Sequence, residues 1–425
     1  MARLRLAARS YARLDRRIWT LAGVRAANTM GLSLVLSFMG IYLVTRRGVS
    51  GVEFGAIYFV ANLCQAAVNT VAGRLSDRIG RRRLMASTLL ARALVIALLG
   101  TLVLLHAPVL LLAAVLICSS SLRGGFEPVA FAVVADLAAP DERTAGFGLQ
   151  RMGTNVGWAV GPALGGLLAS VIDYGWVFFC SVVPLLLSAW AIARMVEPNQ
   201  AALREARRAE ASGSAALRPA AAAPAPPASA ASRGELSLLL ACALVFSIVQ
   251  IQMFSTLSIY ARSELRLVES QIGLLYTVNG IAVLLLQVPA VALISRLRHE
   301  RALVVGTSIY VCALLLIGAA DSHLALSAAI LVATAGEVVV APAQQATVAE
   351  LGDPARLGRA FGALGTMQVL GVALAPLVGG AAYDHLRHEP MAMWGAIASL
   401  AAALALGYAR FGALRRRRVP QGDGP

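Results

Sequence analysis

Two glutamates stand inside long apolar runs, where an ionised side chain is costly. Glu127 follows Arg123 by one helical turn in RGGFEPVAFAVVADL, and Glu337 lies in GEVVVAPAQQATVAEL with no basic residue within a turn. An apolar cavity favours the protonated form of a carboxyl group, and a nearby arginine favours the ionised form. Either acid can therefore load and release a proton as its surroundings change. A cationic ligand competing for the same carboxylate would give exchange of ligand for proton, and we expect Glu337 to be the better proton carrier.

Both acids should lie deep in their spans. Glu127 is about 13 Å from Asp136 and Glu337 about 20 Å from Glu350 along a helix. Ionisable residues at such depth usually face a cavity or a partner, which favours a functional site with Arg123 beside it. The alternative is structural: Glu127 and Arg123 form a buried ion pair, and Glu337 has a similar supporting role.

Such acids need helices that cross a membrane to position them. Of the 425 residues 58% are hydrophobic and 14% charged, with a mean hydropathy of +0.73, more apolar surface than a water-soluble domain could bury. Runs of about 20 apolar residues, long enough to span the bilayer as helices, recur along the chain. We predict an all-α membrane protein with twelve transmembrane helices in two pseudo-symmetric six-helix bundles. The predicted spans are 18–44, 52–72, 84–105, 109–136, 145–170, 175–196, 236–260, 270–294, 302–320, 324–350, 358–383 and 391–412.

The arginines predict the orientation. All 37 basic residues are arginine. With the N-terminus inside, most fall in the tails and in the loops of one face. Those expected on the other face are Arg46, Arg47, Arg262, Arg266 and Arg387, and those expected within spans are Arg25, Arg92 and Arg123. The positive-inside rule then places both termini of this multi-pass protein in the cytoplasm. A basic face beside anionic lipid, rather than nucleic-acid binding, explains the net charge.

The chain divides into two repeats. When the second half is aligned on the first with a shift of 214 residues, Pro342 aligns with Pro128, Glu350 with Asp136, and Glu337 with Arg123. We expect two parallel repeats with a substrate cavity between them near the bilayer midplane. The predicted parts are a basic N-tail (1–17), a first bundle (18–196), a second bundle (236–412) and a C-tail (413–425). Between the bundles lies a cytoplasmic linker (197–235), partly disordered, with a short surface helix near 201–211.

The loop GRLSDRIGRRRLM after the second span can form a charged latch. Gly80 permits a tight turn, Asp77 can face the N-terminus of a helix from the other half, and Arg81 can bridge Asp77 and Asp136. The matching segment of the second half has Ser295 in place of the acid, so such a latch would be asymmetric. A solvated basic loop that only sets topology is the alternative. The predicted latch residues are Gly73, Asp77, Arg78, Gly80, Arg81 and Asp136.

This loop and the two-by-six organisation resemble the major facilitator superfamily. Its signature G-x-L-x-D-R-x-G-R-[KR]-x-x is matched from Gly73 to Arg82. The fifth span carries GWAVGPALGG, which is similar to the G-x-x-x-G-P-x-x-G-G element of the drug/proton antiporter branch. Helix packing by a stripe of small residues explains that element equally well. Its residues are Gly157, Gly161, Pro162, Gly165 and Gly166.

The resemblance implies a monomeric, proton-coupled exporter of amphipathic or cationic small molecules, a multidrug efflux antiporter that works by alternating access. We expect its partners to be lipid, protons and a small-molecule substrate, and we expect no cofactor, metal or enzyme activity, since no nucleotide-binding or catalytic motif is present. The alternatives are a proton-coupled importer of a metabolite or peptide, a lipid flippase, and a membrane scaffold or sensor without transport. Arg25 and Arg92 are expected to snorkel toward the cytoplasmic surface. The side chains expected to line the cavity are Asn28, Gln65, Asn69, Gln250, Gln252, Phe254, Tyr276 and Asn279.

Overall fold

The computed structural model describes residues 14–139, 142–195, 230–294, 297–351 and 357–416, and helices account for nearly all of them. The first half contains α2 (Arg16–Ile41), a π-helical turn η1 (Tyr42–Arg46), α3 (Gly51–Ile79), α4 (Arg81–Leu104), α5 (Val109–Leu137), α6 (Arg143–Ala169), α7 (Tyr174–Cys180) and α8 (Val182–Arg194). The second half contains α10 (Ala230–Ser263), α11 (Glu269–Ile294), α12 (His299–Ala319), α13 (His323–Leu351), α14 (Leu357–Leu386) and α15 (Pro390–Arg416). In the described part of the chain, the predicted all-α class is confirmed.

Each predicted span coincides with one of these helices, apart from the sixth, which is divided into α7 and α8 at Ser181. Eleven helical segments among the described residues are long and apolar enough to cross a membrane. The long helix missing from that set is α6, whose apolar run is interrupted by Gln150, Arg151, Thr154 and Asn155. The linker helix predicted near 201–211 lies outside the described residues.

Local sequence fixes where several helices begin. Ser50 and Glu53 form a reciprocal capping box at the start of α3, and Asp173 caps α7 through the backbone N–H of Gly175. Gly80 separates α3 from α4 with φ of 92°, in the left-handed region that favours glycine. The tight turn predicted after the second span therefore has the backbone conformation that only glycine adopts easily.

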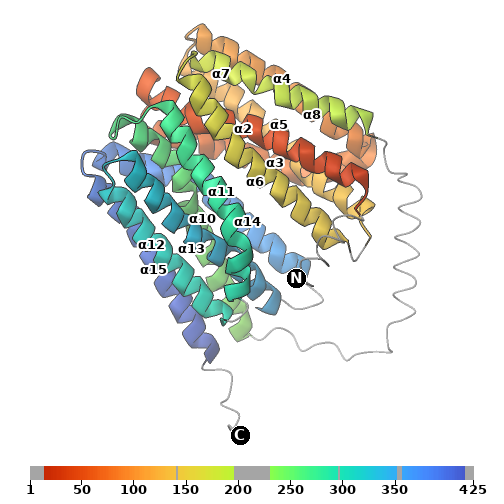
Figure 1. Cartoon of the computed structure of the whole chain (residues 1–425). Coiled ribbons are helices and arrows are strands. Elements are labelled where there is room, and N and C mark those ends of the chain that lie inside the picture. Colours follow the sequence, from red (N-terminus) through yellow and green to blue (C-terminus); the bar gives the residue numbers. More distant parts are fainter. Residues whose placement is uncertain (1–13, 140–141, 196–229, 295–296, 352–356, 417–425) are drawn as a thin grey trace, which may run out of the picture.

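The two halves pack their helices in the same pattern. In the first, α2 packs on α6, α3 on α5, and α4 on α5 and α8; in the second, α10 packs on α14, α11 on α13, and α12 on α13 and α15. The first bundle (red to yellow) and the second (green to blue) lie side by side in Figure 1. This correspondence is the one expected from the repeat in the sequence.

Glycines let the two bundles approach closely. The bundles meet mainly where α3 contacts α14 and α6 contacts α11. At Gly55 an added Cβ would collide with the backbone of Pro376 and Leu377, and at Gly166 with the backbone of Glu269. The GWAVGPALGG element thus contributes to two helix contacts. Gly166 faces α11 of the second bundle, whereas Gly157, Gly161 and Gly165 face α2 of the first.

Side-chain hydrogen bonds join the bundles at the end that carries the loops 47–50, 170–173, 264–268 and 387–389, which we call the far end. There Asp384 of α14 accepts hydrogen bonds from the backbone N–H groups of Gly51 (2.7 Å) and Val52 (2.9 Å), so the second bundle caps a helix of the first. Tyr174 Oη also donates to Glu269 Oε1 at 2.7 Å. The bundles diverge toward the opposite end, where α2 begins and α15 ends (Figure 1).

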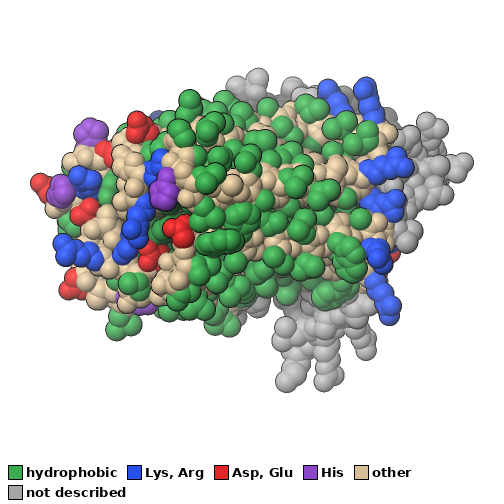
Figure 2. Space-filling view, turned by 90° about the horizontal axis from the view of Figure 1, so that it is seen from above, with side chains coloured by type: hydrophobic (Ala, Val, Ile, Leu, Met, Phe, Trp, Pro, Cys, Tyr) green, Lys and Arg blue, Asp and Glu red, His purple; other side chains and the backbone are tan. Residues whose placement is uncertain are grey.

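The outer surface has the form expected of a bilayer protein. Figure 2 shows a broad band of hydrophobic side chains between two charged ends, one of mixed charge and one lined with basic side chains. Exposed large residues such as Leu94, Leu110, Leu285 and Leu406 belong to this apolar surface. An exposed apolar surface of this extent is stable in lipid and not in water.

Replacing Asp384 by alanine should weaken the far-end contact. The change leaves two N–H groups of the first turn of α3 without an acceptor, and loss of a helix cap typically costs about 1 kcal/mol. We expect a lower melting temperature and a larger distance between spin labels placed on the α3 and α14 ends. Asp321→Ala removes an exposed carboxylate at the same end and is the matched control. Equal behaviour of the two variants would contradict the capping role.

Candidate functional site

A cavity of about 360 Å³ lies between the two bundles. Helices α2, α3, α5 and α6 line it from the first half, and α10, α11, α13 and α14 line it from the second. Its volume lies in the range of roughly 300–1,000 Å³ that is usual for sites binding drug-sized ligands. The lining residues are Leu32, Leu36, Phe54, Tyr58, Asn62, Ser120, Arg123, Arg151, Thr154, Asn155, Trp158, Gln250, Ile251, Phe254, Ser255, Asn279, Gly280, Val283, Glu337, Val372 and Pro376.

Glu337 is the acid on this wall. Its Oε1 accepts a hydrogen bond from Gln250 Nε2 at 2.8 Å, whereas its Oε2 is buried and has no partner at hydrogen-bond geometry among the described residues. The Asn279 side chain, which also lines the cavity, interacts with the same carboxylate. An ionised carboxylate with a buried, unpartnered oxygen is unfavourable. The free oxygen is therefore suited to carry a proton or to accept a hydrogen bond from a ligand.

Arg123 occupies the equivalent position in the first half. Its Nε donates to Gln65 Oε1 at 3.0 Å, and its Nη2 contacts the same oxygen. Arg123 and Glu337 thus hold equivalent positions with opposite charge, and each lines the cavity and bonds to a glutamine. The two glutamines come from helices that are not equivalent, because α3 corresponds to α11 and α10 to α2. The 214-residue repeat predicts this correspondence of position but not the matching glutamine partners.

Glu127 differs from its prediction. It is absent from the cavity lining, and no ion pair with Arg123 within 4 Å is found among the described residues. Its charge acts instead on Arg25 and Arg92. The i, i+4 spacing placed Arg123 correctly on one face of α5, but the guanidinium turns toward Gln65 because α3 packs against that face.

The expectation that Arg92 snorkels is wrong. Arg92 is 3% exposed and donates through Nη1 to Asn28 Oδ1 at 2.6 Å. Arg25 is half-buried, donates through Nε to Thr154 Oγ1 at 3.1 Å, and lies over the Phe131 ring at 4.6 Å. Both guanidinium groups are therefore held inside the first bundle by neighbouring helices.

The side chains predicted to line the cavity divide into two groups. Gln250, Phe254 and Asn279 do line it, and Tyr276 stacks on Phe254 with ring centroids 5.5 Å apart. Gln252 instead donates to Ala375 O at 2.8 Å inside the second bundle. The other three predicted residues, Asn28, Gln65 and Asn69, are also missing from the lining.

Arg151 is the main lining residue that the sequence reasoning missed. It lies within the predicted fifth span but was not counted there with Arg25, Arg92 and Arg123, although a charge inside a span was the available signal. On α6 it faces the cavity, and its charge acts on Glu337 across the space.

The loop after the second span forms a charge cluster within the first half. Arg81 pairs with Asp136, and the two side chains are only 8% and 1% exposed. Arg81 Nη2 lies 3.9 Å from Asp77 Oδ1, and the Asp77 side chain is 59% exposed. Arg81 thus bridges both acids, while Gly73 and Arg78 are exposed. Within the described part of the chain, neither Arg81 nor Asp77 forms a hydrogen bond or ion pair with the second half.

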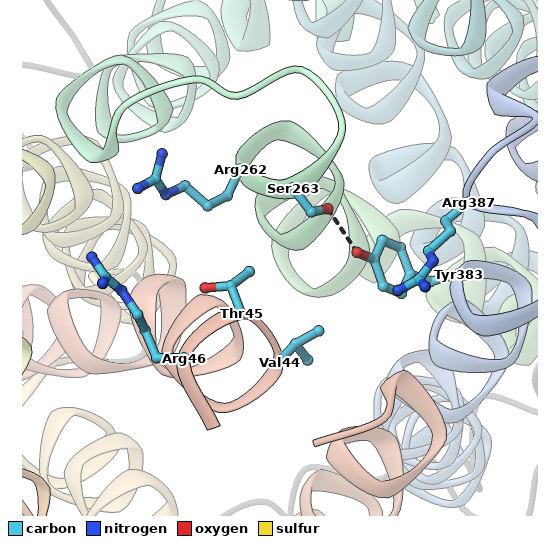
Figure 3. Close-up of a pocket in the computed structure, with 7 residues that line it drawn as sticks. All are labelled: Val44, Thr45, Arg46, Arg262, Ser263, Tyr383 and Arg387. Carbon is cyan, nitrogen blue, oxygen red and sulfur yellow. Dashed lines mark hydrogen bonds between the residues drawn. The ribbon is translucent and has the colours of Figure 1, made fainter. Parts of the chain in front are cut away.

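A second pocket, of about 440 Å³, lies at the far end where η1, α10 and α14 finish (Figure 3). Arg46, Arg262 and Arg387 line it, and Tyr383 Oη donates to Ser263 Oγ at 2.7 Å. Arginines at helix C-termini are already favoured by the helix dipoles. The central cavity is the stronger candidate, because it contains the buried acid with an unpartnered oxygen. No group of three or more His, Cys, Asp or Glu that could hold a metal ion occurs in the described ranges.

Comparison with known proteins gives a family. A model of the Major Facilitator Superfamily matches residues 21–268 and 240–424. The multidrug resistance protein MdtG of Dickeya zeae (strain Ech586) is 33% identical over 177 residues, which cover 39% of this chain and 41% of that protein. The class C tetracycline resistance protein of Escherichia coli is 31% identical over 119 residues, 28% of this chain and 29% of that protein. The chain thus spans less than half the length of the curated relatives it matches.

The fold has solved counterparts. The structure of a POT family transporter in complex with 5-aminolevulinic acid superposes with a TM-score of 0.71 at 13% identity, over 95% of this chain and 96% of that one. At this identity the likeness concerns the fold alone. The family match covers most of the chain, so this multi-pass membrane protein belongs to the Major Facilitator Superfamily, a family of transporters and not of enzymes.

Proposed function

We propose that this transporter exports amphipathic small molecules, including cationic ones, in exchange for protons. The observation that carries the proposal is the Glu337 carboxylate, which is bonded at one oxygen and unpartnered at the other, on the wall of a largely apolar cavity between the two halves. The multidrug and tetracycline resistance relatives support export over the alternatives of an importer, a flippase or a non-transporting scaffold.

The exchange follows from competition for one charge. A cationic group of the substrate and a proton both neutralise Glu337, and they cannot do so together. Proton entry from the outside would displace the substrate, and proton loss to the cytoplasm would prepare the site for the next molecule. No further coupling machinery is needed for antiport.

Alternating access requires the cavity to open at each end in turn. In the proposed orientation both termini, the linker and the basic end lie in the cytoplasm of a bacterial cell, and the protein acts as a monomer in the inner membrane. The far-end contacts through Asp384 and Tyr174 then close the outer side. The bundles diverge on the cytoplasmic side, from which the substrate would enter.

The cluster at Arg81 fits a latch for the alternate conformation. Asp77 lies at the C-terminal end of α3 with its carboxylate exposed, ready to meet a helix N-terminus of the second half when the cytoplasmic ends close. Arg81 and Asp136 would hold the loop in place for that contact.

Glu337→Gln should abolish the coupling. In everted membrane vesicles with an acid interior, we expect proton-driven accumulation of the cation ethidium to fall at least about tenfold, since the glutamine can neither ionise nor exchange a proton. Glu127→Gln is the matched comparison, because Glu127 does not line the cavity, and it should retain most transport. Undiminished uptake by the Glu337 variant would exclude it as the coupling acid.

Arg81→Gln should destabilise the protein strongly. The change removes the charge-assisted hydrogen bond that Arg81 donates to the buried Asp136 carboxylate, and a hydrogen bond to a charged group typically contributes about 1.5–3 kcal/mol. Arg78→Gln, in the same loop but exposed, should have little effect on the melting temperature of the purified protein. Similar melting temperatures for the two variants would show that the Arg81 pair is not structural.

A further inference from the structure

The charges that face the central cavity are unequal. Arg123 and Arg151 line it from the first half, and Glu337 is the only acid among its lining residues. No hydrogen bond or ion pair of Arg151 is found within the described part of the chain, although its charge reaches Glu337. One wall of the cavity is therefore basic and the opposite wall acidic, with a net positive charge.

The basic wall continues behind the cavity. A small side pocket of about 30 Å³ shares Leu32, Leu36, Tyr58 and Ser120 with the cavity and ends at the buried Arg92. Arg25 and Arg92 each lie close enough to Arg123 and Glu127 for their charges to interact. With Arg151, four guanidinium groups and one carboxylate, that of Glu127, thus stand on this side of the cavity. Such an excess of charge at membrane depth is unfavourable unless an anion or water reaches it.

Aromatic rings from both halves border the same space. Phe54 and Tyr58 of α3 have ring centroids 4.7 Å apart, and Trp158 of α6 lies 4.7 Å from Phe254 of α10. Flat apolar surfaces of this kind hold aromatic ligands without fixing one exact shape. The charges that a ligand must carry are consequently set by the two arginines and Glu337.

We propose that the substrates are zwitterionic aromatic amphiphiles, whose anionic group is bound by Arg123 and Arg151 and whose cationic group is bound by Glu337. The proposal rests on the proposed export function, since it concerns the same cavity, and it names the class of substrate. A simple cation satisfies Glu337 but meets two guanidinium groups. A simple anion satisfies the arginines but meets the carboxylate. A zwitterion matches both walls, and its cationic end alone competes with the proton.

The test uses two dyes that differ by one methyl group. Rhodamine 110 carries a free carboxylate and is zwitterionic, and rhodamine 123 is its methyl ester and is a cation. Binding of each dye to the purified protein is measured by fluorescence polarisation. We expect the dissociation constant of rhodamine 110 to be about tenfold lower, because a charge-assisted contact to arginine is lost in the ester.

Arg151→Gln should remove this preference by weakening rhodamine 110 about tenfold, while rhodamine 123 binds as well as before or better. Arg123→Gln should act in the same direction. Arg151 has no partner among the described residues, so its variant remains informative if loss of the Gln65 contact impairs folding in the other. Arg301→Gln, at an exposed position on α12, is the control and should leave both constants unchanged.

Four outcomes would overturn the proposal. The first three are equal binding of the two dyes, preference for the ester, and no binding of either dye. The fourth is an unchanged preference in Arg151→Gln. These results are independent of the export experiment. Ethidium transport that depends on Glu337 would sustain the exchange of cation for proton even if the zwitterion preference fails. If rhodamine 110 is clearly preferred but Glu337→Gln transports normally, the proposed substrate class would stand, and the proposed role of Glu337 in proton coupling would be excluded.

Discussion

A charged group inside a bilayer has to be paired, hydrogen-bonded or in reach of water, and the interior of this transporter is organised around that requirement. Arg92 is held by Asn28, Arg123 by Gln65, and Glu337 by Gln250. Each partner comes from a different helix, so the bundle must form before any of these charges is tolerated. Pairing is incomplete at Arg151 and at one oxygen of Glu337, and both groups face the cavity. Arg25 Nη1 is also buried without a partner but does not face it, so it is position on the cavity wall together with incomplete pairing that marks the binding site.

The repeat gives the two halves the same helix packing, and sequence differences between the halves give the cavity walls different charges. The two halves superimpose their helix packing, yet the position on α5 that carries Arg123 carries Glu337 on α13. If both halves carried the same charged residue at this position, the two charges would repel each other and would bind only one kind of ligand group. Opposite charges at equivalent positions give the cavity a direction across the interface between the halves. A ligand with two opposite charges would therefore align between the basic wall and the acidic wall, across the interface of the two bundles.

Hydropathy and small-residue patterns were sufficient to predict the helices, because length and apolar content decide whether a segment can cross lipid. They could not predict rotation about the helix axis. Gln252 and Gln250 differ by about 200° on a helix, and only the packing of α10 against α14 and α13 decides which of them faces the cavity. Glu127 was misplaced for the same reason. Its pairing with Arg123 is allowed by spacing alone, whereas the neighbouring α3 offers Gln65 to that arginine. Arg92 and Arg151 were misjudged because their partners, or the open space before them, belong to distant parts of the chain.

The cap that Asp384 places on α3 has a consequence for the way the far end opens. The two N–H groups it binds belong to the first turn of a helix and have no intrahelical acceptor. The Val52 hydrogen bond is exposed, so water can replace the carboxylate there before the bundles move. The Gly51 hydrogen bond is partly buried against α14, so water reaches it only as the two helices separate. Opening at the far end would therefore proceed in two steps, with the outer hydrogen bond exchanged for water first and the inner one last.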